Sequence, residues 1–415
     1  MFAPVNGCLI QDWFLLPYEL RLQRVHAGVL AAANVLSADQ LRAIEAAIDA
    51  IGGQFANSNC PESDAEDIHT WIENELTSRV GDAGKRIHTA RSRNDQVATL
   101  LKMFIIDAGD RMADRMARFV RVACDQGEAW ADLVFPLQTH AQFAAPGNVG
   151  FWVLRFAASM QRVHARLNTA VTLWKQYCPL GAGAVAGSSI PIDRNAQAAG
   201  LGFDQPAPNA LDATSTRDEC VELLSIGAVA ALHLQSLAED VIAFAQTPFS
   251  WVRYPAAFGT GSSMMPNKTN PDAMELLRGN CAALLAAPNE AMLLMSRLPS
   301  GYNRDLQCVK PLVHRSVTQL ETLLVLATRF LEALTFDEDR LQESLRAGHL
   351  DATLRMEAMV RDGVAMRDAH HQVASQLDAA PPMQPEVVTQ YATSGSANPD
   401  LTREAAGFIR QALET

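Results

Sequence analysis

Long stretches without proline are the feature that most constrains what this chain can fold into. Proline inside a helix removes a backbone hydrogen bond and costs about 3 kcal/mol, so long helices have to fit between prolines. Four proline-free gaps, at 61–136, 146–179, 208–248 and 311–381, are rich in Ala, Leu, Met, Arg and Glu. These gaps predict long helices.

The last gap also carries a regular apolar stripe. Apolar residues recur from Val313 to Leu334 at alternating steps of four and three. This spacing is typical of a helix that packs nearly parallel to its neighbours. Nearer the N-terminus, Ser37 and Gln40 predict a capping box at the start of another helix. Because alternating β-type runs are scarce, we predict an all-α protein built around a bundle of long helices.

Composition excludes several classes of protein. Hydrophobic residues make up 48% of the 415 residues and charged residues 19%, which is too apolar for a disordered chain. No apolar run reaches the roughly 18 residues that a membrane span needs, so we expect a soluble protein without a membrane partner. The net charge of −12 argues against a nucleic-acid partner, although it allows a local basic pocket for a dianion.

The seven cysteines are scattered and include no CxxC pair. This pattern fits reduced thiols better than disulfides or a zinc site, so we expect a cytoplasmic protein without a bound metal. The first 13 residues show no basic segment followed by an apolar one, and we therefore expect no secretory signal.

Glycine and serine concentrate in two segments, 181–189 and 258–272. The first lacks the GxGxxG spacing and the βαβ context of a dinucleotide site, so we interpret it as a tight turn. The second combines glycines and hydroxyls with a cation at Lys268 and an amide at Asn270. This combination is typical of a mobile lid that carries a proton acceptor and an anion clamp, and a solvated loop is the alternative.

Three further polar clusters are candidates for chemistry. Arg93 and Asn94 open a predicted long helix, where charged donors and the helix dipole suit a carboxylate. Thr139 and His140 are able to bind a substrate or relay a proton. The residues from 302 to 310 lead into the striped helix. Each cluster alone is also compatible with an ordinary packed or solvated surface.

Together these segments carry a resemblance to a known family. The loop GSSMMPNKTNPD, from Gly261 to Asp272, resembles the signature loop of the fumarase and aspartase superfamily of lyases. Within that superfamily, four further segments are similar to segments of the argininosuccinate lyase family. They are HTARSRNDQV, the Thr139-His140 pair, PLGAGAVAG and GYNRDLQ. They occur in the same order and with comparable spacing, and the resemblance covers nearly the whole chain.

The resemblance implies three mostly helical domains. These are an N-terminal helical domain at 1–92, a central long-helix bundle at 93–340 with a catalytic loop at 258–272, and a small C-terminal helical domain at 341–415. It further implies a homotetramer whose active sites are shared between subunits. The implied reaction of arginine biosynthesis cleaves argininosuccinate to arginine and fumarate by anti β-elimination, without a metal or an organic cofactor.

By motif position, the resemblance assigns catalytic roles to three residues. Ser262 would take the Cβ proton, His140 would assist proton transfer to the leaving nitrogen, and Lys268 would stabilise a doubly charged aci-carboxylate. Serine is a poor base in water, so the loop has to close and surround Ser262 with donors and positive charge. The implied substrate-binding residues are Arg93, Asn94, Thr139, Ser263, Asn270, Tyr302, Gln307, Lys310, Gln23 and His69.

Some positions depart from the family pattern. Glu19 stands where Asp is usual, Gln23 where a substrate-binding Ser is usual, and Cys308 where an acidic residue is usual. These departures leave open a lyase that releases fumarate from another N-substituted aspartate. A structural relative without catalysis is a third hypothesis, and the retention of Ser262 and Lys268 argues against it.

Overall fold

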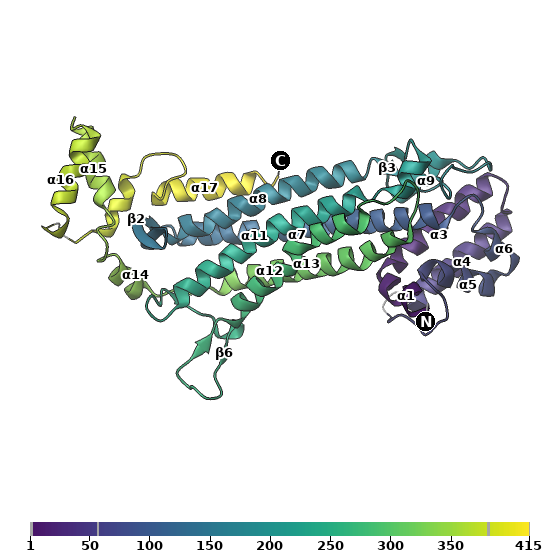
Figure 1. Cartoon of the computed structure of the whole chain (residues 1–415), viewed down its shortest axis with the longest axis horizontal. Helices are drawn as coiled ribbons and strands as arrows, with labels where there is room; N and C mark the ends of the chain where they lie inside the picture. The colour runs from purple at the N-terminus through teal and green to yellow at the C-terminus, as the bar shows by residue number, and fades with distance from the viewer. Residues whose placement is uncertain (1–2, 56–57, 380–381, 415) are drawn as a thin grey trace. The chain divides into compact units, whose positions relative to one another are not determined.

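The computed structural model describes residues 3–55, 58–379 and 382–414. Helices dominate this part of the chain, as predicted (Figure 1). The predicted N-terminal and C-terminal domains include residues 1–2, 56–57, 380–381 and 415, which lie outside the described residues. The division into three domains at residues 92 and 340 stays a prediction.

Five long helices form the framework, and the proline-free gaps account for most of them. Their bounds are α7 (Arg93–Ala129), α8 (Val149–Trp174), α11 (Asp218–Ala245), α12 (Asp272–Met295) and α13 (Val309–Ala333). The predicted stripe is confirmed, because its six apolar positions on α13 and Leu334 directly after the helix are at most 3% exposed. Helix α12 differs from the expectation, since it continues through Pro288.

The chain forms two compact units, and each long helix contributes residues to both. The first unit comprises the residues up to Met112, Arg166–Ala228 and Leu284–Thr318. Its shorter elements are α1 (Ala3–Asn6), α2 (Leu9–Asp12), η1 (Trp13–Leu15), α3 (Leu16–Ala32), α4 (Ala38–Phe55), α5 (Ile68–Val80), α6 (Asp82–Arg86), β3 (Tyr177–Cys178), α9 (Arg194–Leu201), β4 (Gln205–Pro206), α10 (Ala210–Ser215) and η3 (Arg304–Cys308).

Helices α3, α4 and α5 of the first unit pack against one another. The predicted capping box begins α4, where the Ser37 amide donates to Gln40 Oε1 (2.9 Å) and the Gln40 amide donates to Ser37 Oγ (3.2 Å). The apolar side chains that follow, Ile44, Ile48 and Ile51, are buried. Local capping and one apolar face therefore account for this helix.

The second unit comprises Ala113–Ala165, Val229–Ala283 and the residues from Gln319 onward. Its shorter elements are β1 (Val134–Thr139), β2 (Gln142–Asn148), β5 (Val252–Arg253), η2 (Ala256–Phe258), β6 (Thr260–Gly261), β7 (Thr269–Asn270), β8 (Thr335–Phe336), α14 (Glu338–Ser344), α15 (Ala352–Arg361), α16 (Met366–Ser375), η4 (Leu377–Ala379), η5 (Pro385–Gln390) and α17 (Pro399–Gln411).

The β1–β2 hairpin is a feature that the sequence did not predict. The two strands pair antiparallel, from Val134 opposite Asn148 to Thr139 opposite Gln142. Pro136 and Pro146 face each other across the ladder. A two-stranded ribbon accepts prolines because each strand is an edge with unpaired positions.

Helix α11 is the one helix among the described residues whose length and mean hydropathy, 1.5 over its most apolar window, match a membrane span. Of that window, 44% is buried inside the protein. Core helices of soluble proteins meet the same criterion, so this helix does not indicate a membrane span.

Candidate active site

Arg93 begins α7, and its guanidinium is held by the first turns of α5. It donates to Asp67 Oδ1 (2.6 Å), Thr70 Oγ1 (2.8 Å) and Glu73 Oε2 (3.3 Å). Burial acts to raise the pKa of Asp67, but the charges of His69 and Arg93 outweigh it and the pKa is lowered. A substrate carboxylate at Arg93 therefore has to share the guanidinium with two ionised side chains.

Asp95 ties the start of α7 to the glycine-rich segment 181–189. Its Oδ1 accepts a hydrogen bond from the Ser92 amide (2.8 Å), and its Oδ2 accepts from the amides of Gly181 (2.9 Å) and Gly183 (2.8 Å). Both glycines have positive φ, so the interpretation of this segment as a tight turn is confirmed. Burial raises the pKa of Asp95 to about 6, against the effect of the three amides.

Asn94 faces the same glycine-rich segment. Its Nδ2 donates to the carbonyl oxygen of Ala184 (3.0 Å). The tight turn and the beginning of α7 are thus joined through both Asn94 and Asp95, which fixes the orientation of this helix terminus.

Glu19 is the centre of a buried polar network. Its Oε2 lies 2.9 Å from His69 Nδ1, and its Oε1 accepts from Gln23 Nε2 (2.6 Å) and from Gln96 Nε2. Burial acts to raise the pKa of Glu19, but the charge and hydrogen bond of His69 and the charge of Arg91 outweigh it, so the pKa is lowered. Gln23 is fully buried and donates one of its two amide N–H groups to Glu19, while its Oε1 has no hydrogen-bond partner among the described residues.

Lys310 lies in a second buried cluster. Its Nζ is 2.6 Å and 2.7 Å from the two carboxylate oxygens of Asp12 and 3.7 Å from Cys8 Sγ. Burial raises the pKa of the Cys8 thiol to about 12, so the thiol is neutral. Burial also acts to lower the pKa of Lys310, but the charge of Asp12 outweighs it and raises that pKa.

Tyr302 and Gln307 lie at the approach to α13. Burial raises the pKa of Tyr302, while the nearby cation of Lys310 acts to lower it, so these two side chains share one neighbourhood. Gln307 Nε2 donates to the carbonyl oxygen of Asn6 (3.2 Å). The first unit therefore gathers the residues predicted for the amine side of the substrate.

The signature loop of the second unit is a hairpin closed at its base. Strands β6 and β7 pair antiparallel, and Asp272 Oδ2 accepts from both the amide and the hydroxyl of Thr260 (2.7 Å each). Ser262 Oγ accepts from the amides of Met264 (3.3 Å) and Met265 (3.0 Å). Met264 is 88% exposed, and Figure 1 shows the loop at β6 extending away from the helices of its unit.

Thr139 and His140 lie at the tip of the β1–β2 hairpin, and both are exposed. The turn has two residues, His140 with φ 54° and Ala141 with φ 58°. Both central residues of such a turn normally are Gly, Asn or Asp, and the left-handed conformation costs other residues about 1–2 kcal/mol each. The structure therefore presents His140 on a strained, solvent-facing turn.

The predicted site residues are divided between the units. The first unit holds Gln23, His69, Arg93, Asn94, Tyr302, Gln307 and Lys310. The second unit holds Thr139, His140, Ser262, Ser263, Lys268 and Asn270. Across the described part of the chain, no three His, Cys, Asp or Glu side chains group so as to hold a metal ion.

Sequence reasoning missed two carboxylates of the first unit. Asp12 and Asp95 were not singled out, although they organise the surroundings of Lys310 and the turn at 181–189. Asp95 lies directly after Arg93 and Asn94, so its position next to two predicted site residues could have identified it. Asp12 has no such signal, because its partner is 298 residues away in the chain.

Comparison with known proteins gives one family model, described as lyase, that matches residues 13–285. A curated argininosuccinate lyase of Legionella pneumophila (strain Philadelphia 1) is 36% identical over 90% of this chain and 92% of its own. That of Acidothermus cellulolyticus is 38% identical over 89% of this chain and 76% of its own. That of Mycolicibacterium smegmatis is 36% identical over 97% and 92%, respectively.

Solved structures share the fold at low sequence identity. An EDDS lyase in complex with formate gives a TM-score of 0.84 at 18% identity and covers 99% of this chain and 88% of that one. A class II fumarase from Schistosoma mansoni gives a TM-score of 0.73 at 18% identity and covers 93% and 92%. These likenesses agree with the predicted all-α architecture.

Proposed function

Since this chain belongs to the argininosuccinate lyase family, within the fumarase and aspartase superfamily, we propose that it cleaves argininosuccinate to arginine and fumarate. The observation that carries the proposal is the likeness to curated argininosuccinate lyases over most of the chain, with the signature loop retained. The reaction is a β-elimination of arginine biosynthesis that breaks a carbon–nitrogen bond. No metal or organic cofactor takes part in the proposed mechanism.

In the proposed reaction, Ser262 on the signature loop removes the Cβ proton. The electron pair released from that C–H bond moves into the neighbouring carboxylate, and Lys268 and Asn270 stabilise the doubly charged aci-carboxylate. The carbon–nitrogen bond then breaks as the carbon–carbon double bond of fumarate forms. His140 delivers a proton to the departing nitrogen, so arginine leaves with a neutral nitrogen instead of as an anion.

The loop has to close for this chemistry, because an exposed serine has no means of losing its proton near neutral pH. Gly259 keeps the two arms of this loop close together at its base, because a side chain there would meet the Asn270 carbonyl oxygen at 2.6 Å. Closure would replace the water around Ser262 with protein donors and the Lys268 charge.

Substrate binding falls to the remaining predicted residues. Arg93, Asn94, Thr139 and Ser263 supply donors for the carboxylates of the succinyl part. Tyr302, Gln307, Lys310 and His69 supply the surroundings of the arginine part. Gln23 enters this site through Glu19, whose carboxylate it supports by a hydrogen bond.

We assign the enzyme to the cytoplasm as a homotetramer with shared active sites. Exposed apolar side chains on two of the long helices support self-association, since Leu276 and Leu293 on α12 and Leu232 on α11 are 63%, 66% and 51% exposed. A tetramer of four 45.0 kDa chains has a mass of about 180 kDa, which light scattering after size exclusion measures.

The direct test is to incubate the purified protein with argininosuccinate and follow fumarate by its ultraviolet absorbance. Sustained fumarate release with equimolar arginine is expected. An absence of fumarate from a folded, tetrameric sample contradicts the proposal. Catalytic activity of any size would exclude the purely structural alternative.

One observation favours a second candidate, a lyase for another N-substituted aspartate. Gln23 stands where the family has a substrate-binding Ser, and it presents a longer amide group that donates one hydrogen bond to Glu19. One substrate contact of the family is therefore replaced. Fumarate release from another N-succinyl amine, with none from argininosuccinate, would establish this candidate in place of the first.

A further inference from the structure

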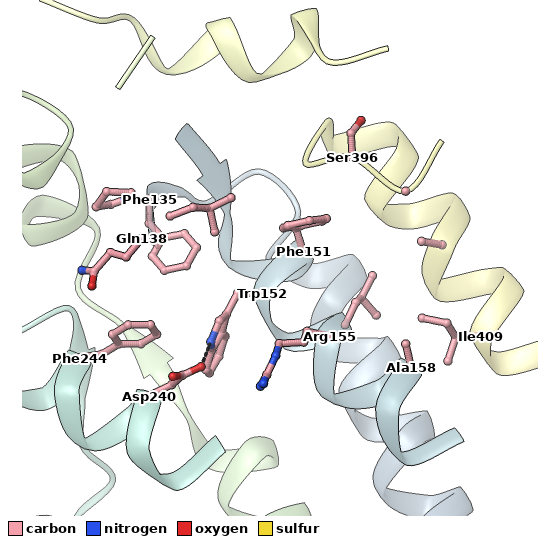
Figure 2. Close-up of a pocket in the computed structure, with 15 residues that line it drawn as sticks. Phe135, Gln138, Phe151, Trp152, Arg155, Ala158, Asp240, Phe244, Ser396 and Ile409 are labelled. Atoms are coloured by element: carbon pink, nitrogen blue, oxygen red, sulfur yellow. Dashed lines mark hydrogen bonds between the residues drawn. The ribbon is translucent and has the colours of Figure 1, made fainter. Parts of the chain in front are cut away.

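A cavity of about 690 Å³ lies in the second unit and contains none of the predicted site residues. It is lined by residues of β1, α8, α11 and α17 and by Gly395 and Ser396 before α17, and it is partly open to solvent (Figure 2). Most of its wall is apolar, and four aromatic side chains line it, those of Phe135, Phe151, Trp152 and Phe244. Aromatic rings at this density favour a ligand with a large apolar part.

Asp240 gives this wall one negative group. Its Oδ2 accepts a hydrogen bond from Trp152 Nε1 (2.9 Å), which fixes the carboxylate and leaves Oδ1 for another donor. Burial raises the pKa of Asp240, and the Trp152 hydrogen bond and the Arg155 charge act against that rise. A ligand cation that reaches Oδ1 would stabilise the ionised form.

Arg155 gives the wall one positive group. Figure 2 shows Arg155 and Asp240 on either side of the Trp152 indole. The Arg155 guanidinium carbon lies 4.6 Å from the centre of the Phe156 ring, which anchors the side chain. Within the described residues, Arg155 forms no ion pair within 4.0 Å, so its charge is available to a ligand.

We propose that this cavity binds a free α-amino acid with a large apolar side chain. The ligand carboxylate would pair with Arg155, its ammonium group with Asp240, and its side chain would pack against the aromatic wall.

Charge complementarity selects this class of ligand over the simpler ones. A plain carboxylic acid would satisfy Arg155 and meet the like charge of Asp240. A plain amine would satisfy Asp240 and meet the like charge of Arg155. An uncharged apolar molecule would desolvate both charges without pairing either. A zwitterion satisfies both groups at once.

Strand β1 connects the cavity to the predicted active-site hairpin. Gln138 lines the cavity on β1, and the next residues are Thr139 and His140 on the strained turn. Occupancy of the cavity therefore bears on the strand that presents the predicted proton donor. This proposed site goes beyond the proposed function, because none of the predicted catalytic or substrate-binding residues lines the cavity.

The test is isothermal titration of the full chain with L-phenylalanine, in the presence of saturating fumarate to occupy the predicted substrate site. Binding of L-phenylalanine is expected, and 3-phenylpropionate and phenethylamine are each expected to bind at least tenfold more weakly. Equal binding of all three compounds, or no binding of L-phenylalanine at millimolar concentration, overturns the proposal.

Variants locate the site. Arg155→Met and Asp240→Asn should each weaken L-phenylalanine binding at least tenfold, and Ala158→Trp should remove it by filling the cavity. Asp368→Asn, an exposed substitution on α16, is the matched control and should leave binding unchanged. Arg155 is exposed, so its variant keeps the test decisive if Asp240→Asn does not fold. Unchanged binding in Arg155→Met and Ala158→Trp would refute the location.

Discussion

His26 shows how this protein holds a buried ionisable side chain in one protonation state. Its Nε2 lies 2.9 Å from the Thr89 carbonyl oxygen, and Gln197 Nε2 lies 2.8 Å from its Nδ1. A carbonyl oxygen requires a donor at Nε2 and an amide N–H requires an acceptor at Nδ1, so only one neutral tautomer fits. Burial, together with the charge of Arg91, lowers the pKa of His26 to about 3.

We predict that His26 makes the protein sensitive to acid. The unfolded chain binds a proton at this residue near pH 6.5, and the folded chain does so only near pH 3. Falling pH therefore favours the unfolded state over this window, by up to about 1.4 kcal/mol per pH unit. The free energy of unfolding is measured by urea unfolding at fixed protein concentration between pH 6 and pH 4.5. His26→Gln should lower the dependence of this free energy on pH by nearly the full value of about 1.4 kcal/mol per pH unit. The exposed control His371→Gln should not.

Ser262 is the residue on which the proposed chemistry depends most directly. Ser262→Ala should lower kcat about a thousandfold, because it removes the base while the rest of the site remains. The Ser262 hydroxyl accepts only loop amides, so the fold and the tetramer should be unaffected. The matched control is Ser375→Ala on α16. Full activity in Ser262→Ala would remove this serine from the mechanism.

At the scale of elements, the hairpin turn at His140 and Ala141 carries measurable strain. Ala141→Gly should stabilise the protein by about 1 kcal/mol, because glycine adopts the left-handed conformation without penalty. Thermal melts followed by circular dichroism measure this change. Ala392→Gly, at an exposed position without positive φ, should not be stabilising. A lower melting temperature for Ala141→Gly would argue that the turn is unstrained.

The contact between α7 and α8 depends on glycine. A Cβ atom at Gly150 would lie 2.1 Å from the Gly127 carbonyl oxygen and 3.0 Å from the Ala131 amide nitrogen. Backbone atoms cannot yield as side chains do, so Gly150→Ala should lower the free energy of unfolding by about 3 kcal/mol. The control Gly407→Ala on α17 has open space around it and should raise stability by about 0.5–1 kcal/mol. Chemical denaturation distinguishes the two.

An element could be predicted when the residues that determine it lie close together in the sequence. Helix α4 and the stripe of α13 depend on residues three or four positions apart, and both were predicted. The β1–β2 hairpin was not, because its strands contain Pro136 and Pro146 and β1 does not alternate in burial. These prolines are acceptable because each strand of a two-stranded ribbon is an edge with unpaired positions, and the residues around each proline do not reveal that arrangement.

At the scale of the whole molecule, the candidate site was predictable through its motifs and not through its packing. The signature loop and Arg93 stand out in the sequence by residue type and order. The cluster of Lys310 with Asp12 does not, since nothing local marks two residues that meet only after folding. The network around Glu19 is of the same kind.

A shared active site predicts complementation between inactive subunits. Ser262→Ala and His140→Asn each remove one catalytic group, and Asn accepts the left-handed conformation at position 140. If the two groups come from different subunits, unfolding and refolding the variants together should restore about a quarter of the wild-type activity. The two variants refolded separately are the controls. No recovery in mixed tetramers would place both groups on one chain.

The pairing of Asp12 with Lys310 also sets an order of events during synthesis. At 5–20 residues per second, the ribosome adds the intervening 298 residues in about 15 to 60 s. Until then the Asp12 carboxylate has no lysine to accompany it into the interior, and burying it alone is strongly unfavourable. The N-terminal helices must therefore leave the ribosome with the Asp12 carboxylate still hydrated. They can bury this carboxylate only after α13, which carries Lys310, has been synthesised.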